Sequence, residues 1–250
     1  MRILTYTQIG THHANHNEDA YTVAELTNTQ QLLATINGTA AGRKGYFTAA
    51  LVAQLLEKIA GELSLQAFAE GGDVETSALL KRCTRALFQE LGKLQNRLNL
   101  TEEELRVTMT LGVVDAEQRN ADFVIIGNGI ISCDEDMVEM AQYAEPDYLC
   151  NHLDKDKAAF NDWWASHDKR VVCQDCLDVA IATPGILTFE PFSHDPYRPV
   201  TEDELLSFLL TERNDGPVEQ LFRRKLLYIE EKFGLLPTDD VTIVRAFVLD

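Results

Sequence analysis

The stretch LLATINGTAAGRKGYFTAALVAQLL, from Leu32 to Leu56, holds the clearest structural pattern in the chain. Its start belongs to an apolar run, 31–36, that is too short for a helix and typical of a buried strand. From Gly45 onward apolar residues recur at helical spacing, which predicts an amphipathic helix after a glycine-rich turn. That stripe consists of Val52, Leu55, Leu56, Ile59 and Leu63. In a chain that binds metal or phosphate, an acidic residue would end the strand, but Asn37 stands there.

The rest of the chain groups its helices instead of alternating them with strands. Apolar patterns predict strands over 2–9, 20–26, 107–115, 121–127, 130–133, 177–183 and the C-terminal residues. A second long helix is predicted through 80–94, and two more over 201–210 and 217–233. Asn128 and Gly129 separate two strands and predict a tight hairpin, whereas 134–176 is polar and holds at most a short helix. This order favours an α+β layered fold, formed by one domain over 1–250, above a doubly wound parallel sheet.

The charge of the chain limits its partners. Lys and Arg number 22 and Asp and Glu number 40, so the formal net charge is −18. Such a charge argues against nucleic acid and against an anionic membrane surface as partners. It suits a basic partner, although it also serves solubility alone.

The N-terminal residues and the cysteines indicate a cytoplasmic protein. The start MRILTYTQIG has no signal-peptide pattern, and no apolar run reaches the roughly 18 residues of a membrane span. The five cysteines are an odd number at irregular spacing, so we expect reduced thiols instead of a disulfide framework.

Five short segments together resemble the metal-dependent protein phosphatase family, also called protein phosphatase 2C. They are HNEDAY around Asp19, TINGT around Asn37, IIGNGII around Asn128, IATPGILTF around Pro184 and TDDVTIV around Asp239. The resemblance covers nearly the whole chain and is closest to a bacterial branch with Gly-x-x-His before its first acidic residue, as in GTHHANHNEDA. It implies a four-layer α-β-β-α sandwich of two antiparallel sheets flanked by helices. In the family, two divalent ions, usually Mg²⁺ or Mn²⁺, activate a water molecule that attacks phosphoserine or phosphothreonine.

The resemblance assigns roles to residues at both ends of the chain. Asp19 matches the first acidic metal ligand, with Glu18 beside it, and Asp239 matches the ligand that opens the last strand. Gly38 matches a residue that supplies a backbone carbonyl to the metal. His13 matches the family histidine that precedes the first acidic ligand, which gives it a structural or phosphate-contacting role.

Three positions in the middle of the chain depart from the family. Asn37 stands where an aspartate bridges both metals, Asn128 where an acidic residue occupies a turn, and Pro184 where an aspartate binds metal. A carboxylate close to a divalent ion contributes on the order of 8 kcal/mol at an effective dielectric of 20, so these changes are severe. Asn128 also has a plainer interpretation as a hairpin residue, and Arg43 as either a phosphate contact or a solvated loop charge.

The leading hypothesis is therefore a catalytically impaired pseudophosphatase that binds a phosphoprotein or another signalling protein, with no metal expected at full occupancy. One alternative is an active serine/threonine phosphatase with an atypical Mg²⁺ or Mn²⁺ site made by Asp19, Asp239 and the Gly38 carbonyl. Another is an acidic scaffold protein that binds a basic partner.

Overall fold

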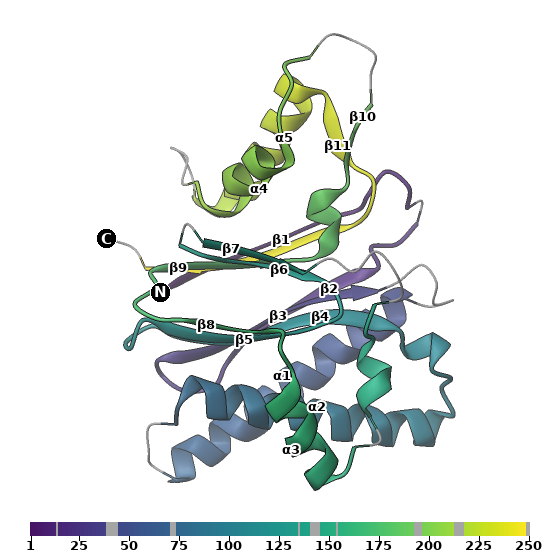
Figure 1. Ribbon diagram of the computed structural model, residues 1–250, viewed down its shortest axis with the longest axis vertical. Coiled ribbons are helices and arrows are strands. Elements are labelled where there is room, and N and C mark those ends of the chain that lie inside the picture. The colour runs from purple at the N-terminus through teal and green to yellow at the C-terminus, as the bar shows by residue number, and fades with distance from the viewer. Residues whose placement is uncertain are drawn as a thin grey trace.

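The computed structural model describes residues 1–13, 15–38, 45–70, 74–134, 136–140, 146–153, 155–192, 197–212 and 218–248. Two five-stranded antiparallel sheets face each other, and helices cover both outer faces (Figure 1). The predicted four-layer α-β-β-α sandwich is confirmed. Among the helices that the structure describes, none is both long enough and apolar enough to span a bilayer.

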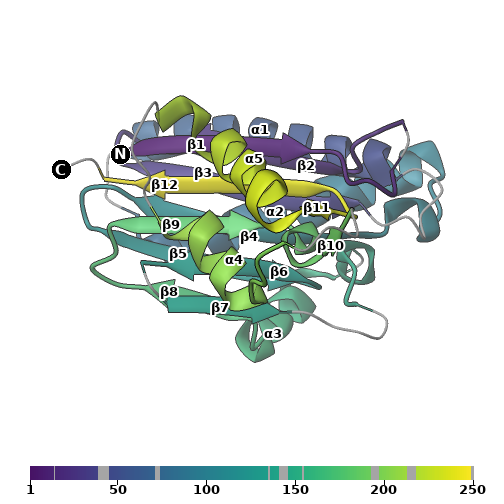
Figure 2. The same cartoon turned by 90° about the horizontal axis from the view of Figure 1, so that it is seen from above.

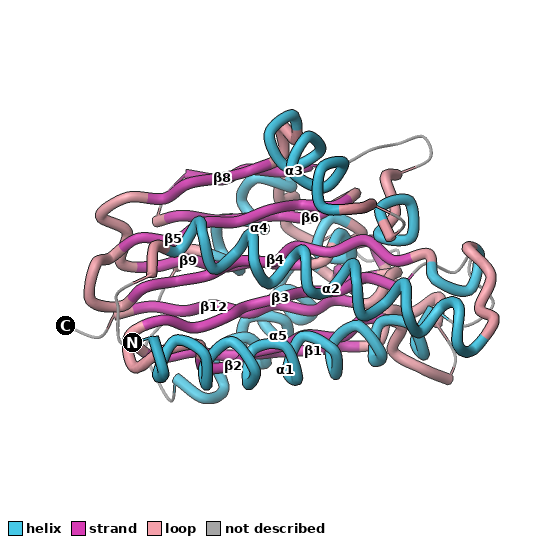
Figure 3. Tube along the Cα trace, turned by 90° about the horizontal axis from the view of Figure 1, so that it is seen from below, coloured by secondary structure: helices cyan, strands magenta, loops and turns pink. Residues whose placement is uncertain are grey.

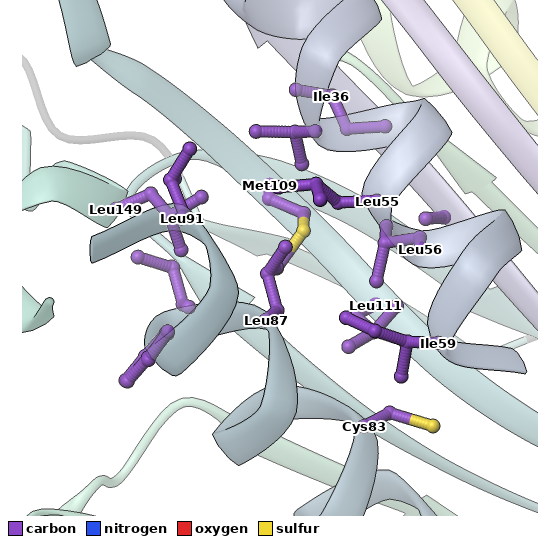
Figure 4. Close-up of a cluster of buried hydrophobic side chains, with 14 of the residues drawn as sticks. Ile36, Leu55, Leu56, Ile59, Cys83, Leu87, Leu91, Met109, Leu111 and Leu149 are labelled. Carbon is purple, nitrogen blue, oxygen red and sulfur yellow. The ribbon is translucent and has the colours of Figure 1, made fainter. Parts of the chain in front are cut away.

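The first sheet lies against the long helices that the sequence predicts. Its strands, in spatial order, are β2 (Asp19–Glu25), β3 (Gln30–Gly38), β4 (Val107–Asp115), β5 (Asn120–Ile126) and β8 (Arg170–Cys173). Its outer face is covered by α1 (Gly45–Glu70), α2 (Thr76–Leu98) and α3 (Lys157–Ser166). Figure 3 shows α1 and α2 lying side by side along the strands. The helical stripe is buried except at Leu63, which is partly buried, and its side chains meet those of α2 and β4 in the core (Figure 4).

The second sheet carries the two C-terminal helices. Its strands, in spatial order, are β1 (Arg2–Gln8), β12 (Val241–Phe247), β9 (Asp178–Ala182), β6 (Gly129–Cys133) and β7 (Asp136–Met140). Above it lie α4 (Glu202–Leu210) and α5 (Leu221–Phe233), together with the ribbon β10 (Phe189–Pro191) and β11 (Leu235–Pro237) (Figure 2). Short 3₁₀ helices occupy Glu103–Leu105, Leu149–His152, Pro184–Leu187 and Val218–Gln220. The sequence did not predict β7 or the β10–β11 ribbon.

The predicted hairpin at Asn128 and Gly129 is wrong. Strand β5 pairs with β4 and β8 in the first sheet, whereas β6 pairs with β7 and β9 in the second. Gly127 and Asn128 therefore carry the chain from one sheet to the other, and Gly127 has a positive φ of 84°. Neither Asn128 nor Gly129 has the positive φ of a two-residue hairpin turn, and both strands bury side chains between the two sheets.

The expectation that all cysteines are reduced is also wrong. Cys133 on β6 and Cys173 on β8 form a disulfide with their Cα atoms 6.4 Å apart. Because the two strands belong to different sheets, this bond links the two halves of the sandwich covalently. Cys83, Cys150 and Cys176 are buried free thiols, as expected.

Reduction of this disulfide should weaken the fold measurably. Because the bond closes a loop with a sequence separation of 40, we expect its loss to lower the free energy of unfolding by about 2–4 kcal/mol. Urea unfolding with and without dithiothreitol measures the change. The Cys133→Ser, Cys173→Ser double variant should show no response to reductant. Five reactive thiols in the non-reduced, unfolded protein would contradict the assignment.

Two buried cations bind the carbonyl groups at the end of α4. Lys225 Nζ donates to the carbonyls of Phe208 at 2.5 Å, Leu209 at 3.0 Å and Glu212 at 2.6 Å. Arg245 donates to the Glu212 carbonyl and makes two hydrogen bonds to the Asp178 carboxylate. Both cations are fully buried. Burial, and then the charge of Arg245, lowers the pKa of Lys225 to about 7.

This lysine should make stability depend on pH in a defined direction. In the unfolded chain its pKa returns to about 10.4, so between pH 7 and 10 the unfolded state binds more protons than the folded state. The free energy of unfolding should therefore rise with pH in this window, by about 1 kcal/mol per unit relative to Lys225→Met. Urea unfolding of both proteins at pH 6, 7, 8 and 9 measures it, and parallel curves would contradict it.

Candidate functional site

Strand ends from both sheets converge on one end of the sandwich. In the first sheet Asn37 pairs with Asp19 on β2 and with Thr108 on β4, near the end of β3. In the second sheet Gln8 pairs with Val241, so the start of β12 lies at this end too. The chain termini lie at the opposite end (Figure 1).

A cavity of about 390 Å³ opens where these strands end. It is lined by His12, His13, Asn37, Gly38, Thr108, Asn128, Pro146, Pro184, Thr238 and Asp239. Six sequence-predicted site residues are thus brought together from segments far apart in the chain. Asp19 is not among the lining residues but lies on the strand beside Asn37. Arg43 lies outside the described residues.

Asp240, which the sequence analysis did not single out, fixes the geometry beside the cavity. Its side chain is only 1% exposed. It accepts hydrogen bonds from the backbone N–H of Gly10 at 2.8 Å and of Glu18 at 2.5 Å, and it contacts His13 Nδ1 at 2.9 Å. The carboxylate therefore ties the segment after β1 to the start of β12. The only sequence signal for it is the second acidic residue in TDDVTIV.

His13 lies between the two acidic residues of that segment. Its Nδ1 faces Asp240, and its Nε2 lies 3.3 Å from Asp239 Oδ1. Asp239 is 42% exposed and faces the cavity, whereas Asp240 points into the protein. Because carboxylates engage both ring nitrogens, the structural role predicted for His13 has clear partners. Its phosphate contact stays a prediction.

Asp19 and Glu18 add two further carboxyl groups. Asp19 accepts a hydrogen bond of 2.6 Å from the Thr183 hydroxyl. Burial raises the pKa of Asp19 well above its ordinary value; the charges of Asp239 and Asp240 add to this, and the Thr183 hydrogen bond opposes it. Burial also raises the pKa of Glu18, and one of its buried carboxylate oxygens has no hydrogen-bond partner among the residues that the structure describes.

Pro184 opens a 3₁₀ turn that packs tightly against the acidic segment. A Cβ atom built on the next residue, Gly185, would lie 1.9 Å from the carbonyl oxygen of Asp240. Glycine is therefore required for the close approach of these two backbones. Pro184 itself lines the cavity and offers neither a side-chain oxygen nor a backbone N–H.

The side chains present do not fit a two-metal centre. Hard divalent ions require several oxygen ligands, preferably anionic. Asn37 and Asn128 are neutral, Pro184 provides no ligand, and Asp240 is engaged by three groups within the protein. Over the residues that the structure describes, no three His, Cys, Asp or Glu side chains are grouped so as to hold a metal ion. Asp239 is the acidic residue among the described residues that line the cavity.

No protein-family model and no curated protein sequence matches the chain. Solved structures do match it. A bacterial serine phosphatase in which one arginine is mutated to glutamate is 14% identical to this chain with a TM-score of 0.64. The match covers 100% of this chain and 99% of that one. The PP2C phosphatase domain of SpoIIE from Bacillus subtilis, solved with a fragment of its regulatory domain, is 14% identical with a TM-score of 0.56, covering 98% of this chain and 64% of that one. RsbX in complex with magnesium is 14% identical with a TM-score of 0.51, and the match covers 97% of this chain and 92% of that one.

These matches cover 97–100% of this chain. Their low identity limits the likeness to architecture. The chain therefore has the fold of the bacterial protein phosphatase 2C-type serine/threonine phosphatases.

Proposed function

We propose that this chain is a pseudophosphatase, which keeps the phosphatase 2C architecture and binds a signalling protein without hydrolysing phosphate. The observation that supports this most directly is Pro184 in the wall of the cavity, facing the same space as Asn37 and Asp239. A proline cannot ligate an ion through its side chain, and an amide cannot bridge two cations as a carboxylate does.

Electrostatics supports the loss of hydrolysis. Each missing carboxylate removes on the order of 8 kcal/mol of attraction for a divalent ion at an effective dielectric of 20. The attraction missing at Asn37 and Pro184 together is about 16 kcal/mol, which is more than the roughly 8–12 kcal/mol that micromolar to nanomolar binding represents. Nucleophilic water and charge neutralisation on the phosphoryl group both depend on such ions in two-metal catalysis.

The charge of the cavity also bears on what it recognises. Glu18, Asp19 and Asp239 place carboxyl groups at or beside it, and His12 and His13 are the basic residues among its described lining. The exposed carboxylate of Asp239 would repel a phosphate group that enters the cavity. We therefore favour a signalling protein that offers a positively charged group to the cavity over a phosphoprotein whose phosphate enters it.

A second candidate function is an active phosphatase that uses one Mg²⁺ or Mn²⁺ ion near Asp19, Asp239 and the Gly38 carbonyl. A buried carboxylate oxygen of Glu18 has no partner in the described part of the chain, which favours this candidate, since a bound cation would satisfy that atom. The magnesium complex of RsbX shows that one protein of this fold binds such an ion.

Restoring the missing carboxylates separates the two candidates. With p-nitrophenyl phosphate and Mn²⁺, we expect background turnover for the unmodified chain and at least tenfold more for Asn37→Asp with Pro184→Asp. The same pair of substitutions at exposed sites, Asn28→Asp with Pro191→Asp, should restore nothing. Turnover by the unmodified chain that disappears in Asp19→Ala would support the active enzyme and contradict the pseudophosphatase.

A further inference from the structure

A second, larger groove lies at the end of the sandwich opposite the cavity. Its volume is about 570 Å³, and the β2–β3 turn, the β4–β5 turn and the last turns of α1 form it. Strand β3 connects the two sites, with Gln30 paired to Asp115 at the groove end and Gly38 paired to Val107 at the cavity end. At about 3.3 Å per residue, the two sites are roughly 26 Å apart. A molecule bound in the groove would leave the cavity free.

The helix beside the groove exposes large apolar side chains. Phe68, which lines the groove, is 90% exposed, and Leu65, one turn earlier, is 73% exposed. Residues three apart lie on the same face of a helix, so these two side chains form one patch. The opposite face of α1 is buried in the core. Fully burying a phenylalanine side chain is worth about 1.5–3 kcal/mol, so a partner that covers this pair would gain binding free energy.

The groove is negatively charged. Glu25 and Glu117 are exposed on its two turns, and no Lys, Arg or His is among the described residues that line it. The C-terminal end of α1 adds partial negative charge, and its last turn contains no basic residue. Asp115 is 2% exposed and accepts from the N–H groups of Glu117 and Gln118, so it fixes the turn that presents Glu117.

We infer that this groove docks a cationic segment of a partner protein, in which Lys or Arg side chains flank an apolar residue. The cationic groups would face Glu25, Glu117 and the end of α1, and the apolar residue would cover Phe68 and Leu65. A second copy of this chain fits poorly, because each copy carries a net charge of −18 and presents the same acidic groove. The inference holds whether or not the cavity hydrolyses phosphate.

The test uses the full chain and a fluorescein-labelled peptide, Lys-Lys-Leu-Ala-Lys-Phe-Lys-Lys, followed by fluorescence anisotropy in 0.15 M salt. The Glu25→Lys, Glu117→Lys variant should weaken binding at least tenfold. The Glu57→Lys, Glu231→Lys variant makes the same change in net charge at exposed sites outside the groove and should weaken it less than threefold. Gln118→Lys adds repulsion without removing a carboxylate and should also weaken binding. It tests the inference if the Glu117→Lys substitution prevents folding.

The apolar contribution is tested separately. Phe68→Ser should weaken binding severalfold while leaving its salt dependence unchanged, whereas Phe192→Ser, at another partly exposed phenylalanine, should have no effect. Peptide-induced protection from amide exchange should fall on residues 25–30, 64–68 and 115–118. No binding, equal weakening by the two double charge variants, or protection at the cavity instead would each overturn the inference.

Discussion

The buried carboxylate of Asp240 is the constraint on which the acidic end of the molecule depends. Three donors converge on it: two backbone N–H groups and the ring of His13. A buried charge is tolerable only when hydrogen bonds satisfy it. The segment after β1 must therefore lie alongside the start of β12. That path places Glu18 and Asp19 beside β3, where Asn37 and Gly38 end the strand. His13 then reaches Asp239, which faces the cavity.

This arrangement shows which contacts hold the backbone at the acidic end of the fold. The groups that hold the backbone in place are internal: Asp240, the Thr183 hydroxyl against Asp19, and the close contact of Gly185 with Asp240. None of them requires an ion. Asn37, Asn128 and Pro184 lie on the surface of the cavity, where substitution alters chemistry and leaves these internal contacts intact. The contacts that shape this end of the molecule therefore do not involve the three positions that depart from the family.

The sequence predicted most of the layers and placed most of the candidate site. Periodicity was sufficient for α1, α2 and the central strands because their apolar faces are long and regular. It failed at Asn128, where a turn signal cannot distinguish a hairpin from a crossing between sheets. It also failed for Cys133 and Cys173, since spatial proximity of residues 40 apart leaves no local pattern. Asp240 was missed because burial, not residue type, separates its role from that of Asp239.

Manganese binding tests the central claim most directly, because it asks about the ions without depending on any substrate. Titration of the full chain with Mn²⁺, followed by the electron paramagnetic resonance signal of the free ion, gives both stoichiometry and affinity. The account predicts at most one weakly bound ion, lost when Asp239 is changed to Asn, and two ions after Asn37→Asp with Pro184→Asp. Two ions bound with micromolar affinity by the unmodified chain would contradict it.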